Sequence, residues 1–114
     1  MKAERMPKSQ QNVFGEPIEL CCNDPVTGFY RDGHCNTGPN DLGTHTVCAL
    51  MTSTFLEYSA LAGNDLSTPR PEHGFPGLVG GNRWCLCALR WEQAHRAGKA
   101  PKLYLRATNI VTLR

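Results

Sequence analysis

This sequence of 114 residues lacks the features that identify several common classes of protein. It has no uninterrupted apolar run of about 18 residues, which excludes a membrane-spanning helix. Residues 1–11 carry charges but no apolar stretch, so they do not form a secretory signal, and we expect a cytoplasmic protein that binds no membrane. No catalytic or nucleotide-binding signature with a testable spacing occurs, so the sequence limits the function without naming it.

A strong net charge is also absent, because 12 Lys and Arg residues stand against 10 Asp and Glu residues. The charge is uneven, however, since residues 90–114 contain six basic residues and a single acidic one, Glu92. Such a segment could bind an acidic partner, which makes a protein-interaction module one alternative function. Aromatic residues do not interleave with these charges as a stacking platform, so nucleic acid is not an expected partner.

Glycine and proline, in contrast, are abundant, with 11 and 8 residues. Both residue types favour turns and interrupt regular elements, and a chain of this length suits one hydrophobic core. We predict residues 1–11 as a flexible lead-in and residues 12–114 as a single globular domain. The expected fold class is α+β, with a small mixed β-sheet, two short helices and long loops rich in glycine and proline.

The local pattern predicts two strand-to-helix units. The first has a strand at residues 44–51, rich in Thr, Val and Leu, and a helix that Thr52 caps and Gly63 ends. The second has a strand at residues 83–89 and a helix at residues 90–97. Each unit contains the same Cys-Ala-Leu sequence, which suggests two similar units whose strands lie parallel.

The rest of the chain is expected to be extended or irregular. Residues 12–22 and 102–113 are predicted to be extended, and residues 29–30 to form a short strand. Residues 24–43 and 64–82 are predicted to be long loops, because each contains several glycines and prolines. We expect these loops to lie near one edge of the sheet and to carry the functional site, since long loops in small domains are often functional.

Six cysteines are the most prominent chemical feature of the chain. In a reducing cytoplasm we expect free thiols unless they bind metal or cycle between redox states, and the even count would suit three disulfides only in an exported protein. Cys85 and Cys87 point to the same face of a strand, because side chains alternate with period two. With Cys35 and Cys48 they are the candidate ligands for a tetrahedral zinc ion.

Alternatives to this zinc site remain open. The spacing differs from the paired C-x(2–4)-C knuckles of structural zinc sites, which favours thiols packed as small core residues over zinc ligands. His34 or His45 could also replace one thiol as a ligand. A thiol-redox module is a further alternative, although Cys85-Leu86-Cys87 is not the C-x-x-C motif of thioredoxin-like proteins.

The same residues could instead form a nucleophilic site, because its members need only be close in space. The candidates are a cysteine nucleophile, a histidine base and a polar residue that orients the base: Cys35 or Cys48, His34 or His45, and Asp32, Asp41 or Asn36. This hypothesis leaves open whether the protein is an enzyme.

Three arginines are the only cations between residues 9 and 89: Arg31, Arg70 and Arg83. A guanidinium group binds carboxylate or phosphate through two parallel hydrogen bonds, so a small anionic ligand is expected. Asn36 and Asp65 complete the candidate ligand-binding set, and the alternative is that the arginines form ion pairs with nearby acidic residues. The leading hypothesis is therefore a small-molecule binding or catalytic domain with a polar Cys/His/Asp/Arg pocket.

Several longer motifs resemble one known family. They are DPVTGFYRDG at residues 24–33, HTVCA at 45–49, GNDLSTPRP at 63–71, FPGL at 75–78 and RWCLCA at 83–88. Together they are similar to the bacterial domain of unknown function family numbered 2237, over residues 12–108. The resemblance implies a small, soluble single-domain protein, and it carries no activity, substrate or catalytic residue over to this chain.

Overall fold

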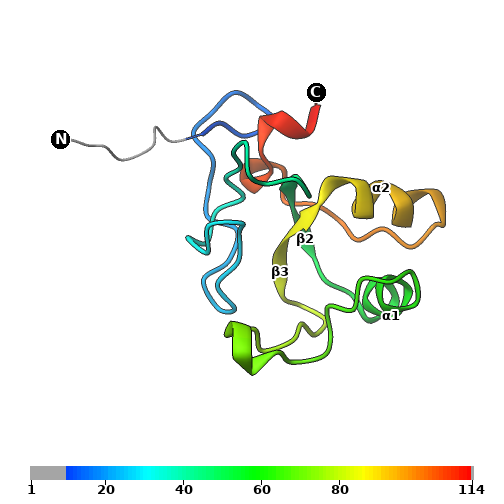
Figure 1. The fold of residues 1–114 in the computed structure, drawn as a ribbon. Coiled ribbons are helices and arrows are strands. Elements are labelled where there is room, and N and C mark those ends of the chain that lie inside the picture. Colours follow the sequence, from blue (N-terminus) through cyan, green and yellow to red (C-terminus); the bar gives the residue numbers. More distant parts are fainter. Residues whose placement is uncertain (1–9, 114) are drawn as a thin grey trace.

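The computed structural model describes residues 10–113, and Figure 1 shows its ribbon. Within these residues the main elements follow the order β2 (His45–Leu50), α1 (Ser53–Leu61), β3 (Arg83–Cys87) and α2 (Ala88–Arg96). The predicted α+β class, with a small sheet, two short helices and long loops, is confirmed. No helix in the described part of the chain is long and apolar enough to cross a membrane.

The two strands pair antiparallel, so the expected parallel arrangement is wrong. Leu50, at the end of β2, lies opposite Arg83, at the start of β3, and Cys48 lies opposite Cys85. The long connection between the strands therefore leaves and re-enters the sheet at the same end. A shared three-residue sequence says nothing about where a connection of this length returns, which is why the direction could not be inferred from it.

Helix α1 begins and ends where its sequence predicts. The hydroxyl of Thr52 accepts a hydrogen bond from the backbone N–H of Phe55, which satisfies one of the unpaired donors of the first turn. Phe55 and Leu56 are buried in the core, and Gly63 follows the helix with a φ of +99°, a conformation that costs little only for glycine. The local signals alone therefore place this helix.

The segments predicted to be extended are mostly irregular. Residues 102–113 contain two 3₁₀ helices, Leu105–Ala107 and Ile110–Leu113, which corrects the prediction of a last strand. The segment does run beside β2, because Cys48 and Thr46 accept hydrogen bonds through their carbonyl groups from later backbone N–H groups. The tight turn of the first 3₁₀ helix lies between these two contacts, so a continuous ladder cannot form.

The N-terminal part of the fold is likewise built from turns and single bridges. Residues 12–22 form only isolated bridges, and residues 29–30 lie in a turn, so neither prediction of extended structure holds. Of the predicted lead-in, residues 1–9 lie outside the described residues. Gln10 is already part of the fold, because its side-chain amide pairs with the backbone N–H and C=O of Thr37.

Alternate residues of the two strands face opposite sides of the sheet. The main core contains Val47 and Ala49 of β2 and Trp84 and Leu86 of β3, packed with residues of both helices. The intervening Cys48 and Cys85 belong to a second buried cluster, on the side covered by irregular chain. In Figure 1 both helices lie on one side of the strands, and the segment coloured blue to cyan lies on the other.

Two disulfides, Cys21–Cys48 and Cys35–Cys85, join the irregular segment to the sheet. The expectation of free thiols is therefore wrong for these four cysteines, whereas Cys22 and Cys87 are unpaired and partly buried. Residues 10–43 contain neither helix nor strand, so the cross-links supply constraints that regular structure does not. Because Cys48 and Cys85 are opposite one another in the ladder, the two disulfides lie side by side.

Candidate functional site

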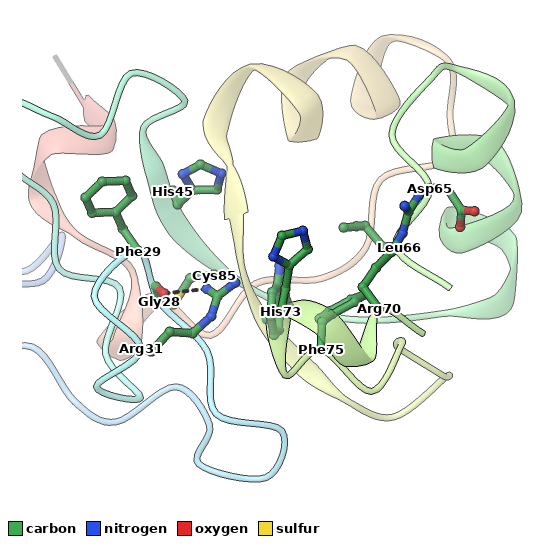
Figure 2. A pocket seen from close by; sticks show the side chains of 11 residues that line it. Gly28, Phe29, Arg31, His45, Asp65, Leu66, Arg70, His73, Phe75 and Cys85 are labelled. Atoms are coloured by element: carbon green, nitrogen blue, oxygen red, sulfur yellow. Dashed lines mark hydrogen bonds between the residues drawn. The ribbon is translucent and has the colours of Figure 1, made fainter. Parts of the chain in front are cut away.

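A pocket of about 540 Å³ lies beside β3, where the two long loops meet (Figure 2). The turn at residues 28–31 forms one wall, and residues 65–75 form the other. The strands contribute His45, Trp84 and Cys85. Cavities of about 300 to 1,000 Å³ are typical of small-molecule sites, so the pocket is large enough for a metabolite-sized ligand.

His45 and Asp41 form the best-defined polar pair at this pocket. The buried Asp41 carboxylate accepts hydrogen bonds from the His45 ring Nδ1 at 2.6 Å, from the His45 backbone N–H at 2.9 Å and from the Thr37 hydroxyl at 3.0 Å. Burial raises the pKa of Asp41, but these hydrogen bonds outweigh burial and lower the pKa below its ordinary value. The resulting anion accepts from Nδ1, and no described residue forms a hydrogen bond with Nε2 of His45.

Packing also fixes the orientation of the His45 ring. The Phe29 ring stacks on it, with 6.3 Å between ring centres and an interplanar angle of 21°. Gly43 approaches so closely that a Cβ atom at this position would lie 2.6 Å from Cε1 of the imidazole. His45 is thus held by a hydrogen-bonding partner and an aromatic neighbour, and a side chain at position 43 would displace its ring; Figure 2 shows it at the edge of the cavity.

Arg31 provides a cation on the same wall as Phe29. Its guanidinium carbon lies 5.2 Å from the centre of the Trp84 ring, and Nη1 donates a hydrogen bond to the carbonyl of Gly28 at 2.6 Å. The backbone φ of Arg31 is +55°, a region that residues other than glycine seldom occupy. Among the described residues no other group accepts from this guanidinium, so most of its donors remain available to a ligand.

Arg70 and His73 stand on the opposite wall (Figure 2). The backbone N–H of Arg70 donates to the carbonyl of Phe75, and that of Phe75 donates back to the carbonyl of Arg70, so a short hydrogen-bonded turn presents both side chains. No described residue accepts a hydrogen bond from the Arg70 side chain. Phe75 packs edge-on against Trp84, with ring centres 5.3 Å apart, and so connects this turn to the floor of the pocket.

Asp65 is the one carboxylate among the residues lining the pocket. It accepts hydrogen bonds from the Thr68 hydroxyl at 2.6 Å, from the Ser67 N–H at 2.9 Å and from the Thr68 N–H at 3.2 Å. These bonds lower the pKa of Asp65, with the Thr68 hydroxyl as the largest cause. Its oxygens therefore stabilise a turn of the loop and are committed to it.

The predicted cluster of Asp32, His34 and Asn36 does not face the pocket. The Asp32 carboxylate accepts from the His34 backbone N–H at 3.1 Å and from the Asn36 side-chain amide at 2.9 Å, and the His34 ring bonds back to the Asp32 carbonyl. These residues stabilise their own exposed turn. The structure therefore places the two candidate histidines apart, and only His45 has a buried carboxylate partner.

Three of the four predicted metal ligands do come together, but as disulfides. Cys35, Cys48 and Cys85 are fully buried, and the fourth member of their group is Cys21 rather than Cys87. The sulfur atoms of Cys21, Cys35 and Cys85 lie within 4.8 Å of one another, close enough to hold a metal ion. Cys87 occupies the position before the first residue of α2 and is outside this group, and the ladder is irregular at this point, between the pairs His45–Cys87 and Val47–Leu86.

The remaining predicted cations lie away from the pocket. Arg83 stacks on Tyr104, with its guanidinium carbon 4.4 Å from the ring centre, and so borders a different depression. In the basic C-terminal segment, Arg90 donates to the carbonyl of Ala62. Two further arginines form ion pairs, Arg96 with Glu92 and Arg106 with Glu16. These contacts give no specific support to an interaction surface built from this segment.

Several residues of the site are not predicted from the sequence. The sequence identifies Asp41 only as one of three polar residues that could orient a histidine. Its position four residues before His45 is the only local signal that the two side chains interact. His73, Phe75 and Trp84 line the pocket without any signal that distinguishes them from ordinary loop or core residues. Cys21 pairs with a cysteine 27 residues away, and no sequence spacing indicates that partner.

A family model described as "Uncharacterized protein conserved in bacteria (DUF2237)" matches residues 11–114, nearly the whole chain. The resemblance inferred from the sequence motifs is thereby confirmed. A search of curated proteins finds no match. The family description names no ligand or reaction, so a functional conclusion depends on the geometry of the pocket.

Proposed function

The chain belongs to the DUF2237 family of uncharacterized proteins conserved in bacteria, and because that description names no activity, we propose from its pocket that it binds a small anionic molecule. The observation that carries this proposal is the charge of the cavity. Arg31 and Arg70 face it from opposite walls with guanidinium donors that the described residues leave unused. The one lining carboxylate, Asp65, accepts its hydrogen bonds within its own turn and offsets one of the two guanidinium charges, so these groups leave a net positive charge.

A carboxylate or phosphate group is the chemical class that such a cavity suits. Guanidinium groups offer pairs of parallel donors that match the oxygens of these anions, and the bonds are strengthened by charge. The aromatic rings of Phe29, Phe75 and Trp84 line the same space and would pack against the apolar part of a ligand. We therefore propose a small organic acid or phosphate ester, held at its anionic end by one or both arginines.

His45 adds a catalytic capability to this binding site. With Asp41 holding Nδ1, the Nε2 atom can accept a proton from a bound molecule, as a general base does. Asp41 would act by positioning the ring and would stabilise the imidazolium that forms. Catalysis is proposed here for the pocket without a named reaction, and a cytoplasmic location remains part of the same proposal.

Replacing Arg70 tests the proposal directly. We expect Arg70→Gln to weaken the binding of inorganic phosphate or citrate by about tenfold or more, since a hydrogen bond to a charged group contributes about 1.5 to 3 kcal/mol. Binding to the non-reduced chain would be measured by calorimetry and by tryptophan fluorescence, because Trp84 lines the cavity. Added salt should weaken binding to the unsubstituted chain.

Arg83→Gln is the matched control for this experiment. It removes an arginine that also contacts an aromatic ring, but outside the pocket. Affinity should be unchanged in this variant. Equal losses in both variants, or no saturable binding of either anion by the unsubstituted chain, would contradict the proposal.

A thiol-redox module is a second candidate, because one observation favours it. Two disulfides lie side by side in the described structure, and unpaired Cys22 is adjacent in sequence to the disulfide-bonded Cys21. A thiolate next to a disulfide is the arrangement from which thiol–disulfide exchange starts. Zinc, the cofactor expected from the sequence, is a proposal for the reduced chain only, since a disulfide offers no thiolate ligand.

A further inference from the structure

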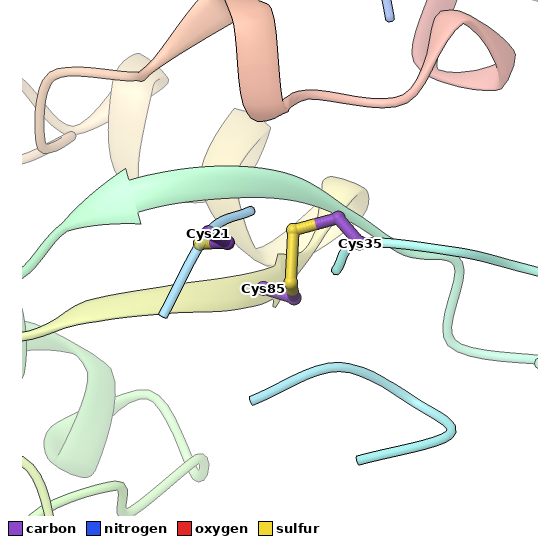
Figure 3. Close-up of side chains that lie close together, drawn as sticks. All are labelled: Cys21, Cys35 and Cys85. Carbon is purple, nitrogen blue, oxygen red and sulfur yellow. A yellow bond between two sulfur atoms is a disulfide. The ribbon is translucent and has the colours of Figure 1, made fainter. Parts of the chain in front are cut away.

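The four disulfide-bonded cysteines form a second chemical centre beneath the sheet. Their side chains come from four separate segments, and each is at most 2% exposed. The sulfur atoms of Cys21, Cys35 and Cys85 lie within 4.8 Å of one another, and Cys48 is bonded to Cys21. Figure 3 shows Cys21 beside the disulfide that joins Cys35 to Cys85, between the two strands and the loops.

We propose that reduction of both disulfides turns this cluster into a closed four-thiolate site for a tetrahedral metal ion, with zinc as the expected occupant. Zinc–sulfur bonds of about 2.3 Å place the four sulfur atoms of a tetrahedral site about 3.8 Å apart. To reach this spacing, Cys21 and the Cys35–Cys85 pair would approach by no more than about 1 Å, and the sulfur atoms within each disulfide, now 2.06 and 2.04 Å apart, would separate by about 1.7 Å. Thiolate ligands in a closed tetrahedron are the preferred coordination of structural zinc.

The backbone that carries these cysteines is held independently of the disulfides. Cys48 and Cys85 are opposite one another in the antiparallel ladder, so their side chains leave the sheet on the same face. Each of the four residues also makes a backbone hydrogen bond to a residue outside the cluster: Cys21 to Gly33, Cys35 to Asn109, Cys48 to Thr108 and Cys85 to Thr27. After the sulfur–sulfur bonds break, these hydrogen bonds still hold the four positions, three of which bring their sulfur atoms within 4.8 Å of one another while Cys48 lies next to Cys21.

The surroundings suit a closed site rather than an exchangeable surface site. Ile18 and Ala107 are the other members of the buried cluster, so the sulfur atoms are shielded by apolar groups. Reduction would remove the two covalent links between the irregular segment and the sheet and leave only hydrogen bonds and packing to hold that segment. A metal ion bound to all four sulfur atoms would restore the tether, and a reducing cytoplasm would favour this form over the disulfides.

Forming the proposed site takes two steps, reduction of both disulfides and replacement of thiol protons by the metal ion. A dithiol or phosphine reductant gives two electrons to each disulfide, the sulfur–sulfur bond breaks, and each sulfur atom takes up one proton. Four thiols result. Binding of one divalent ion replaces up to four thiol protons, which are released to solvent, so uptake should be stronger at higher pH.

Cobalt(II) tests this site, because tetrahedral thiolate coordination gives it a characteristic visible absorption. We expect the chain reduced with a phosphine to bind one equivalent of Co²⁺ with that absorption, and Zn²⁺ to displace it. Serine substitution of any one cluster cysteine, for example Cys21→Ser or Cys48→Ser, should weaken Co²⁺ binding at least tenfold, since losing even a residue that only supports a ligand costs about 10- to 100-fold.

The chain supplies matched controls in its two unpaired cysteines. Cys22→Ser and Cys87→Ser should leave the cobalt spectrum and affinity unchanged, because neither residue belongs to the cluster. An unfolded reduced chain would bind metal through any of its thiols, so equal losses in all six serine variants would overturn the proposal. Absence of tetrahedral cobalt absorption in the reduced chain would also overturn it. The anion titration uses the non-reduced chain, so the two proposals fail separately.

Discussion

At the scale of single residues, the buried Asp41 positions His45, which lines the pocket, although Asp41 itself does not line it. Its carboxylate joins the loop at Thr37 to both the backbone and the ring of His45. The three hydrogen bonds stabilise the carboxylate more than the neutral acid, which is why they lower its pKa. The sequence shows that an acidic residue lies four positions before a histidine. Only the folded loop shows that this carboxylate is buried and that His45 is its hydrogen-bonding partner.

Asp41→Asn tests this role through the pH dependence of stability. A carboxylate whose pKa is lowered by folding stabilises the fold above its unfolded value near pH 4, and this contribution is lost as the pH falls through the folded pKa. We expect the variant to lose about 1 to 3 kcal/mol at pH 7 and to show a smaller further loss between pH 5 and pH 2 than the unsubstituted chain. Urea unfolding at each pH would measure both effects.

Asp65→Asn is the comparison for that experiment. Its carboxylate also accepts hydrogen bonds in a turn, but it is exposed, so solvent screens most of its contribution. We expect a smaller effect on stability than for Asp41. Parallel acid-induced losses in the unsubstituted chain and in Asp41→Asn would show that Asp41 is not the group responsible.

At the scale of elements, local signals place both helices and the strands β2 and β3, but they give neither the direction in which the strands pair nor the structure of residues 102–113. Thr52 and Gly63 mark the ends of α1 because capping and left-handed backbone act within a few residues. Helix α2 begins at Ala88, two residues earlier than predicted, since Ala88 and Leu89 are strong helix formers and β2 offers the strand no partner beyond Cys87. The alternation in residues 102–113 predicts a strand, yet it is interrupted by 3₁₀ turns.

Removing the cap of α1 should cost stability without changing the fold. Thr52→Ala leaves the N–H of Phe55 without its acceptor, and we expect a loss of about 1 kcal/mol in the free energy of unfolding. Chemical denaturation would measure it. Ser53→Ala is the control, because this exposed neighbour makes no capping bond, and its effect should stay within about 0.5 kcal/mol. Equal effects would mean that the cap contributes nothing specific.

At the scale of the whole molecule, the segments that cover the two faces of the sheet are attached to it by different interactions. Helices cover one face through apolar packing, which forms the main core. The other face is covered by chain without regular structure, and two disulfides attach it. The pocket lies where these two halves meet, since its walls come from loops on either side of β3.

Loss of either disulfide should therefore destabilise the oxidised protein strongly. The closed loops span separations of 27 and 50 residues, for which chain entropy gives about 3.5 and 4 kcal/mol. We expect the paired serine variants Cys21→Ser with Cys48→Ser, and Cys35→Ser with Cys85→Ser, to lose stability of this order in denaturation without reductant. Cys22→Ser should change it by about 0.5 kcal/mol or less. Alkylation of the unfolded, non-reduced chain should modify two cysteines, and six modified residues would contradict the pairing.

The sequence by itself determined what neighbouring residues decide: the helix at Thr52, its end at Gly63, the loop-rich α+β class and the motifs of its family. Tertiary structure alone decided that the strands run antiparallel, that Cys21 rather than Cys87 joins the sulfur cluster, and that His45 and not His34 has a buried carboxylate partner. The physical reason is the separation along the sequence between the residues that interact. Caps and turns are formed by atoms a few residues apart, whereas pairing of distant cysteines and the meeting of two loops depend on the path of the whole chain.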